Sequence, residues 1–174
     1  MLRKVFTASF VVAAMAIVPM FARADFQAGN WELELGGSGT ANKQVSAGNF
    51  AIAADLGYFL TKNIEVAVRQ SVGFADAQHS KSIVTASTAI AADWNFDMGN
   101  FVPFVGGNVG YAYGNNGFKD QWAAGPEAGL KWFLNSTTFV YGIVEYEILF
   151  GGNHVNSSNN GLFMYQVGLG VALK

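Results

Sequence analysis

The sequence has no cysteine, so a disulfide framework, a thiolate metal site and a cysteine nucleophile are all excluded. Charge is also scarce, because only 13% of the 174 residues are charged and the formal net charge is −2. Such a chain offers no basic surface to phosphates, and we expect no nucleic-acid partner. With only two histidines we also expect no metal site and no cofactor.

Glycine and aromatic residues are plentiful, with 21 glycines and 14% Phe, Trp and Tyr. Glycine interrupts helices and aromatic side chains favour strands, so this composition argues against a helical bundle. Intrinsic disorder is excluded as well, because 51% of the residues are hydrophobic. The composition therefore favours a single domain built of β-strands.

The first 24 residues differ in kind from the rest. Two basic residues precede a mostly apolar stretch, residues 5–21, which is followed by Ala22-Arg23-Ala24. A charged start, an apolar middle and small residues at alternate positions are typical of a secretory signal peptide. The alternative is a membrane-anchoring helix, which needs about 20 apolar residues, whereas this stretch is shorter and contains Pro19. We therefore expect a signal peptide, residues 1–24, and one domain, residues 25–174.

The domain divides into eight strand-like runs and contains no stretch of the ~18 apolar residues that a spanning helix needs. The runs are 28–36, 48–60, 64–75, 83–98, 101–113, 122–134, 138–150 and 162–173. The breaks after the second, fourth and sixth runs are short, and the other breaks are longer. An even strand number with short turns at one end and longer loops at the other is typical of a transmembrane β-barrel.

Within each run, bulky apolar residues alternate with small or charged ones. In the last run Phe163, Val167 and Leu169 share one face, whereas Gly168 and Gly170 lie on the other. A soluble lipocalin-like barrel would turn the bulky face inward, but eight strands enclose a narrow lumen that suits the small and charged face. The bulky face then needs lipid around it. The sequence predicts an all-β, eight-stranded antiparallel up-and-down transmembrane β-barrel, with small residues and a few charges inside.

Aromatic residues gather near both ends of the predicted strands. Those near the short turns are Tyr58, Trp94, Phe96, Phe101, Trp132 and Phe139, and those near the long loops include Tyr111, Tyr113, Trp122 and Phe163. Two aromatic girdles of this kind mark the two interfaces of a membrane with water. Ordinary enrichment of aromatics in strands is the alternative, but it would not place them at both ends.

The segment Leu56-Gly57-Tyr58-Phe59-Leu60-Thr61-Lys62-Asn63-Ile64-Glu65-Val66 resembles a strand–turn–strand of the small outer-membrane β-barrel proteins of the OmpA/OmpX/OmpW kind. This resemblance implies the outer membrane of a Gram-negative bacterium, with its lipid and lipopolysaccharide around the barrel. It also implies short turns in the periplasm, longer loops outside the cell, and insertion by the barrel-assembly machinery. That machinery recognises a final aromatic residue, whose place Leu173 takes here, followed by Lys174.

Charged residues of the inward face are mostly acidic. The carboxylates are Glu32, Glu34, Asp55, Glu65, Asp93, Glu127, Glu145 and Glu147, and the cations are Arg69 and Lys131. Buried charges must be paired. We expect an ion-paired plug, in which Arg69 near mid-height gathers Asp55, Glu127 or Glu145 and closes the lumen.

A narrow, water-filled lumen that favours cations is the alternative. Inward glycines would leave space beside the acids, and these are Gly106, Gly110, Gly125, Gly129, Gly168 and Gly170. Glycine in these positions also permits the coiling of strands in a tight barrel. The inward face by itself leaves both interpretations open.

A third hypothesis is a lipid A-modifying enzyme at the outer leaflet, because His154 lies near Ser157 in the last long loop. The outer-membrane lipid A deacylases carry a His-x-Ser-Asn motif with a Glu shortly downstream, whereas here Asn156 follows His154 at that spacing. No Asp or Glu comes after His154 in the chain. His79 and Ser80 in another loop give no recognisable catalytic arrangement. We therefore predict a monomeric, non-enzymatic barrel with a structural or surface-exposed role.

Overall fold

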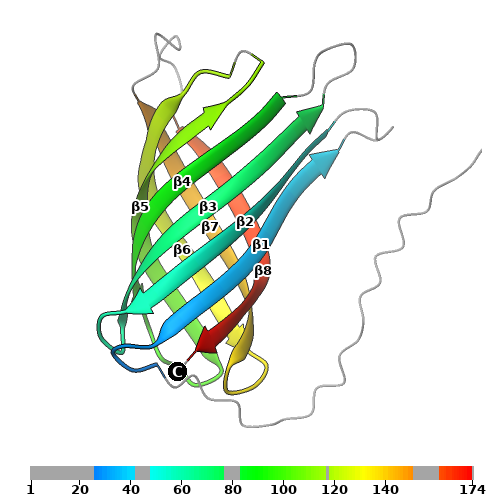
Figure 1. Cartoon of the computed structure of the whole chain (residues 1–174). Helices are drawn as coiled ribbons and strands as arrows, with labels where there is room; N and C mark the ends of the chain where they lie inside the picture. Colours follow the sequence, from blue (N-terminus) through cyan, green and yellow to red (C-terminus); the bar gives the residue numbers. More distant parts are fainter. Residues whose placement is uncertain (1–25, 42–47, 77–82, 117, 151–160, 174) are drawn as a thin grey trace, which may run out of the picture.

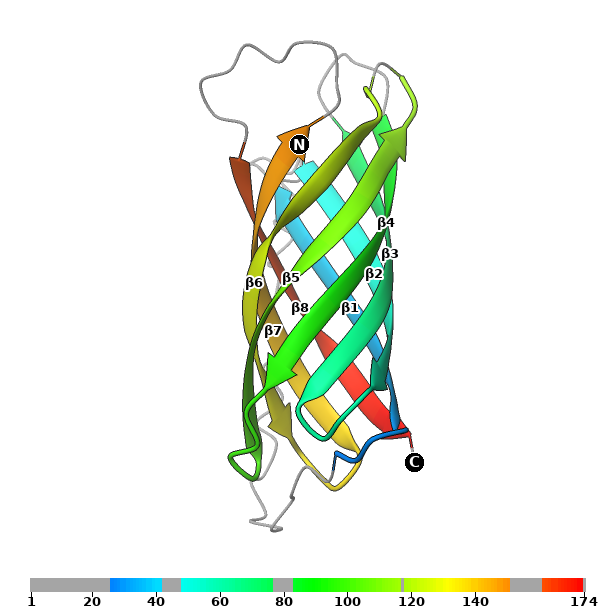
Figure 2. The same ribbon diagram turned by 90° about the vertical axis from the view of Figure 1, so that its left-hand side faces the viewer.

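The protein forms one closed barrel in a computed structural model that describes residues 26–41, 48–76, 83–116, 118–150 and 161–173. Its strands are β1 (Trp31–Ala41), β2 (Gly48–Phe59), β3 (Ile64–Asp76), β4 (Ile83–Asn95), β5 (Phe101–Gly114), β6 (Gln121–Phe133), β7 (Thr138–Phe150) and β8 (Gly161–Leu173). Figure 1 and Figure 2 show them tilted around a common axis. The predicted signal peptide, residues 1–24, lies outside the described residues.

Every strand pairs antiparallel with its neighbours in the chain, and β1 closes the barrel on β8. The predicted all-β, eight-stranded antiparallel up-and-down barrel is therefore confirmed. None of the described residues forms a helix that is long and apolar enough to span a membrane.

The first strand begins and ends later than the predicted range of 28–36. The chain first turns at Gly29, whose φ of +95° suits glycine, and Phe59 N donates to Asn30 O at 2.9 Å. β1 then continues to Ala41, where it pairs with Gly48 of β2. Glycine-rich sequence lowers strand propensity, but the hydrogen-bonded ladder from β2 maintains the strand.

The fourth strand is shorter than the predicted range of 83–98, because β4 ends at Asn95. The following residues form a tight turn instead. Asp97 Oδ1 accepts a hydrogen bond from Gly99 N at 2.9 Å, and Gly99 has a φ of +83° that a residue with a side chain rarely adopts. The turn that Asp97 and Gly99 favour therefore outweighs the tendency of the apolar Phe96 and Met98 to continue the strand.

The two faces of each strand differ sharply in exposure. On β2, Leu56 is 45% exposed, whereas the neighbouring Asp55 is 3% exposed. On β8, Leu169 points outward and Gly170 is buried. The apolar face is thus the outer face of the cylinder, and the face that carries the charges lines its interior.

The end of the lumen near the short turns is filled with aromatic rings, contrary to the expectation that bulky residues do not fit inside. We call this the aromatic plug; its residues are Phe26, Phe59, Val102, Phe104, Phe133, Phe139, Tyr141, Ile143 and Ala172. Phe26, from the segment before β1, stacks on Phe59 at a centroid distance of 4.3 Å and meets Phe133 at 5.4 Å. The assignment of Phe139 to the outer girdle is wrong, because this ring is fully buried in the lumen.

Inward glycines make room for these rings. Gly129 faces Phe104 across β5 and β6, and Gly170 faces Phe139 across β7 and β8. A Cβ atom added at either glycine would overlap the ring opposite. The pairing of a glycine with an aromatic neighbour is a known way to stabilise a glycine in a sheet. We call the half of the barrel nearer the short turns the lower half. In this half, these glycines therefore do not leave open space.

Two ladders of the wall are incomplete. The pairs of β1 with β8 run from Trp31↔Leu173 to Gly37↔Val167, although among the described residues both strands extend further toward the long loops. The ladder of β6 with β7 skips Pro126, which has no backbone N–H to donate. Among the described residues, β1 and β8 are therefore paired near the short turns and not near the long loops.

The contact of Gly170 with Phe139 gives a test of the fold. Gly170→Ala should lower the free energy of unfolding by about 1–3 kcal/mol, because the added methyl group would overpack the plug. The control is Gly142→Ala on the outer face, where the nearest atom to the added Cβ is 3.9 Å away. Urea-induced unfolding in lipid vesicles measures both variants. Equal stability of the two variants would contradict the packing described here.

Candidate functional site

The interior of the barrel is the candidate site, and it is arranged in layers along the axis. Above the aromatic plug lies a cluster of ion pairs around Lys131, and above this lies a second cluster around Arg69. A cavity occupies the half nearer the long loops and has Arg69 at its floor. Each layer is built from the inward residues of several strands.

The Lys131 cluster brings three glutamates of β1 and β3 to one ammonium group on β6. Lys131 Nζ pairs with a Glu32 oxygen, with Glu34 Oε1 at 3.2 Å and with Glu65 Oε2 at 2.9 Å. Asn95 Nδ2 also donates to Glu65 Oε2 at 3.1 Å. All of these side chains are buried, so the pairs satisfy charges that water does not reach.

Three aromatic rings of the plug lie around the same ammonium group. Lys131 Nζ lies 5.4 Å from the ring centroid of Phe104, 5.5 Å from that of Phe139 and 5.9 Å from that of Phe59. A cation within about 6 Å of a ring face is attracted by the electrons of the ring. Lys131 therefore joins the polar layer to the plug, and together they close the lower lumen.

The Arg69 cluster is the second polar layer. Arg69 Nε donates to Asp55 Oδ2 at 2.8 Å, its two terminal nitrogens each lie 3.4 Å from an oxygen of Glu127, and Nη1 also pairs with Glu145. Asn108 Nδ2 donates to Glu127 Oε2 at 2.6 Å. A guanidinium has five donors in a rigid plane, so it can serve carboxylates from three other strands at once. The structure thus brings all three expected carboxylates to Arg69.

Between the two clusters the lumen is almost filled. A void of about 10 Å³ lies there, with Asp93, Phe104 and Lys131 among its walls. This volume holds about one water molecule. Among the described residues, the interior is therefore closed at the level of the clusters.

Acidic residues outnumber the cations of the lumen. All eight inward carboxylates are buried, and six of them pair with Lys131 or Arg69, whereas Asp93 and Glu147 form no ion pair with the described residues. Buried oxygens that have no hydrogen-bond partner among the described residues are found on Glu32, Asp55, Asp93, Asn95 and Glu147. Within the described ranges, the interior therefore has acceptor oxygens that its donors do not reach.

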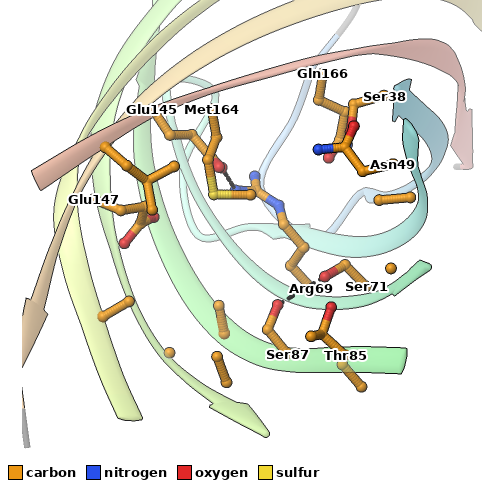
Figure 3. A pocket seen from close by; sticks show the side chains of 18 of the residues that line it. Ser38, Asn49, Arg69, Ser71, Thr85, Ser87, Glu145, Glu147, Met164 and Gln166 are labelled. Carbon is orange, nitrogen blue, oxygen red and sulfur yellow. Dashed lines mark hydrogen bonds and ion pairs between the residues drawn. The ribbon is translucent and has the colours of Figure 1, made fainter. Parts of the chain in front are cut away.

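The cavity has a volume of about 550 Å³ and lies between Arg69 and the long-loop end. Hydroxyl and amide side chains form much of its polar wall, and these are Ser38, Asn49, Ser71, Thr85, Ser87 and Gln166. Figure 3 shows these groups on opposite sides of Arg69, with Glu145 and Glu147 on the β7 side. Small residues such as Gly110 and Ala89 keep the space open.

Apart from Phe139, the predicted girdle residues lie on the outer face. Near the short turns, Tyr58 contacts Trp31 at 4.9 Å between ring centroids, Phe101 stacks on Trp132 at 5.8 Å, and Trp94 is exposed. Near the long loops, Tyr111 contacts Trp122 at 5.1 Å and Tyr113 at 6.4 Å, and Phe163 contacts Tyr146 at 4.9 Å. Most of these outer aromatics therefore contact a ring on a neighbouring strand.

Sequence reasoning missed the aromatic plug and the two asparagines of the clusters. Strand parity could have found them, because Phe133 lies two residues after Lys131, and Phe139 and Tyr141 alternate in step with Glu145. A narrow lumen suggests small inward residues only, and this expectation does not take account of glycines that make room for rings.

Residues of the enzyme hypothesis lie outside the described residues, and these are His79, Ser80, His154, Asn156 and Ser157. Within the described part of the chain, no group of three or more His, Asp or Glu side chains is arranged to hold a metal ion.

Removal of the cation from the upper cluster tests its energetic role. Arg69→Met should lower the free energy of unfolding by about 3–5 kcal/mol, because it leaves buried carboxylates without a partner. The control is Lys62→Met in an exposed turn, where loss of a surface charge costs about 1 kcal/mol or less. Unfolding in lipid vesicles, followed by tryptophan fluorescence, compares the two variants. Wild-type stability of Arg69→Met would contradict the cluster's role.

No protein-family model matches the sequence, and no curated protein matches it either. Solved structures do match. The N-terminal β-barrel domain of Pseudomonas aeruginosa OprF is 18% identical with a TM-score of 0.61, and the match covers 86% of this chain and 100% of that one. The outer membrane protein OprG of the same organism is 14% identical with a TM-score of 0.60, covering 87% and 99%.

Neisserial surface protein A is similar as well, at 17% identity and a TM-score of 0.57, over 83% of this chain and 96% of that one. At these identities the likeness extends to the fold. The chain thus has the fold of the small eight-stranded outer-membrane β-barrel proteins.

Proposed function

We propose that the protein is an integral, monomeric protein of the bacterial outer membrane with a structural or surface-exposed, non-enzymatic role. The observation that carries this proposal is the closure of the lumen by the aromatic plug and by the Lys131 and Arg69 clusters. A barrel closed in this way is a scaffold that presents its outer end to the surroundings and does not conduct.

The outer face supports a place in a membrane. Leu35, Ile90 and Leu169 are each more than half exposed at mid-barrel, and aromatic pairs flank this apolar surface at both ends. Exposure of such a surface to water would cost free energy, whereas contact with acyl chains would not. The closed ladder leaves few backbone groups without partners, which a membrane also requires.

The membrane environment determines the partners that we propose. These are outer-membrane lipid and lipopolysaccharide around the apolar belt, and the barrel-assembly machinery during insertion after export. We propose no nucleic-acid partner and no cofactor.

A narrow cation-favouring channel is the alternative function. The outer half has a cavity of the size that solutes need, but the lower half is filled by side chains that are almost completely buried. The cavity therefore supports binding at the outer end better than it supports passage.

Electrical recording of the refolded protein in planar bilayers tests the closed lumen. We expect no steady current from the wild-type protein. Arg69→Ala, Lys131→Ala and Phe139→Ala combined should conduct, because together they remove the cations of both clusters and a ring of the plug. The control is Phe101→Ala, which removes an outward ring near the same end and should stay silent. A steady cation-selective current through the wild-type barrel would overturn the proposal in favour of a channel.

A further inference from the structure

The cavity in the outer half is not explained by a closed structural barrel. About 550 Å³ is within the usual range of small-molecule pockets, and a scaffold has no need of such a space. The inward positions around it carry small residues, among them Gly73, Ala89, Gly110, Ala112 and Ala123. In the lower half, inward positions of the same strands carry rings of the plug instead, such as Phe104 on β5 and Phe133 on β6.

The floor of this cavity is rich in carboxyl groups. Arg69 is already surrounded by Asp55, Glu127 and Glu145, and Glu147 adds a fourth carboxylate to one cation. The floor therefore favours a positively charged ligand and disfavours an anion.

Glu147 is the group that such a ligand would meet. It is 6% exposed and lines the cavity, and among the described residues its Oε2 has no hydrogen-bond partner. Figure 3 shows its carboxylate apart from that of Glu145, which pairs with Arg69. Asn108 also hydrogen-bonds to this carboxylate, which leaves Oε2 as the oxygen that a ligand would meet. A buried carboxylate in this setting is stabilised by a charged donor.

The wall of the cavity is mostly apolar, with Leu149, Leu162 and Met164 among its residues, and it carries polar groups on two sides. One group of hydroxyls lies on β3 and β4, where Ser71 and Ser87 share a hydrogen bond of 2.7 Å. On the other side, Gln166 donates to Tyr141 Oη at 2.6 Å and lies near Ser38 in Figure 3. These are neutral groups that can both donate and accept, so they suit an uncharged body with hydroxyl or amide groups.

A metal ion fits this site less well than an organic cation. A metal needs several oxygen ligands around one point, and no such group of acidic or histidine side chains is found within the described ranges. One carboxylate with neutral hydroxyls nearby matches an ammonium group on a polar body.

We propose that the outer cavity binds a small organic cation, whose primary ammonium group is held by Glu147 and whose uncharged body lies with its apolar parts against the apolar wall and with any hydroxyl or amide groups against the serine, threonine and amide side chains. The inference deepens the proposed surface role and rests on it in one respect, namely that the long-loop end faces the cell exterior.

The test is a binding titration of the full barrel domain refolded in lipid nanodiscs at low salt, followed by calorimetry and by NMR shifts. The probes are glucosamine and 1,5-diaminopentane, with glucose and N-acetylglucosamine as neutral counterparts of glucosamine. We expect saturable binding of at least one amine and binding at least tenfold weaker for both neutral sugars. Absence of saturable binding of both amines, or equal binding of glucosamine and N-acetylglucosamine, would overturn the inference.

Two variants locate the site. Glu147→Gln keeps the shape and removes the charge, so it should weaken amine binding at least tenfold. Asp97→Asn makes the same change in the turn at the opposite end, and it should bind as the wild-type protein does. If Glu147→Gln binds amines as tightly as Asp97→Asn, the inference is wrong.

Ala112→Trp keeps every carboxylate and fills the cavity, so it tests the site even if the Glu147 variant does not fold. It should abolish binding of both amines, and unchanged binding would overturn the inference. The bilayer recordings separate this inference from the proposed function. A conducting wild-type barrel that still binds amines through Glu147 would contradict only the closed lumen, and a silent barrel that binds no amine would contradict only the cavity's role.

Discussion

The interior of an eight-stranded barrel is too narrow to hydrate its charged side chains, so each charge must find its partners among the other inward residues. Lys131 and Arg69 meet this constraint by gathering three carboxylates each. Their position inside the cylinder obliges the apolar face of every strand to point outward. The outer surface, its aromatic borders and the need for lipid all follow from that reversal of the usual soluble arrangement.

The same constraint divides the lumen into a closed half and an open half. Rings of Phe104 and Phe139 cover Gly129 and Gly170, so the glycines of the lower half support packing and leave no passage. In the upper half, Gly110 and Ala112 have no such rings across from them, and a cavity remains above Arg69. A barrel of this kind can be sealed against ions and still offer a binding site at one end.

Much of the fold could be predicted from the sequence, because strand alternation and turn chemistry are local signals. The ranges from residue 48 onward match the strands within about three residues at each end, and Arg69 has the carboxylates that were expected around it. The aromatic plug could not be predicted by the same reasoning. Whether a ring such as Phe139 fits inside depends on a glycine in a neighbouring strand, and this is a property of the register across the sheet. The role of Phe26 depends likewise on the turn at Gly29, which brings it beneath the lumen.

The orientation of the two faces is tested most directly by NMR of the refolded protein in nanodiscs that contain a lipid-soluble paramagnetic probe. We expect strong broadening of the side-chain signals of Val68, Ile90 and Leu169, which lie on the outer face. The signals of Ala53, Ala67 and Ala172, which are buried in the lumen, should stay sharp. Broadening of the alanine signals with sharp signals from Val68, Ile90 and Leu169 would show that the apolar face points inward.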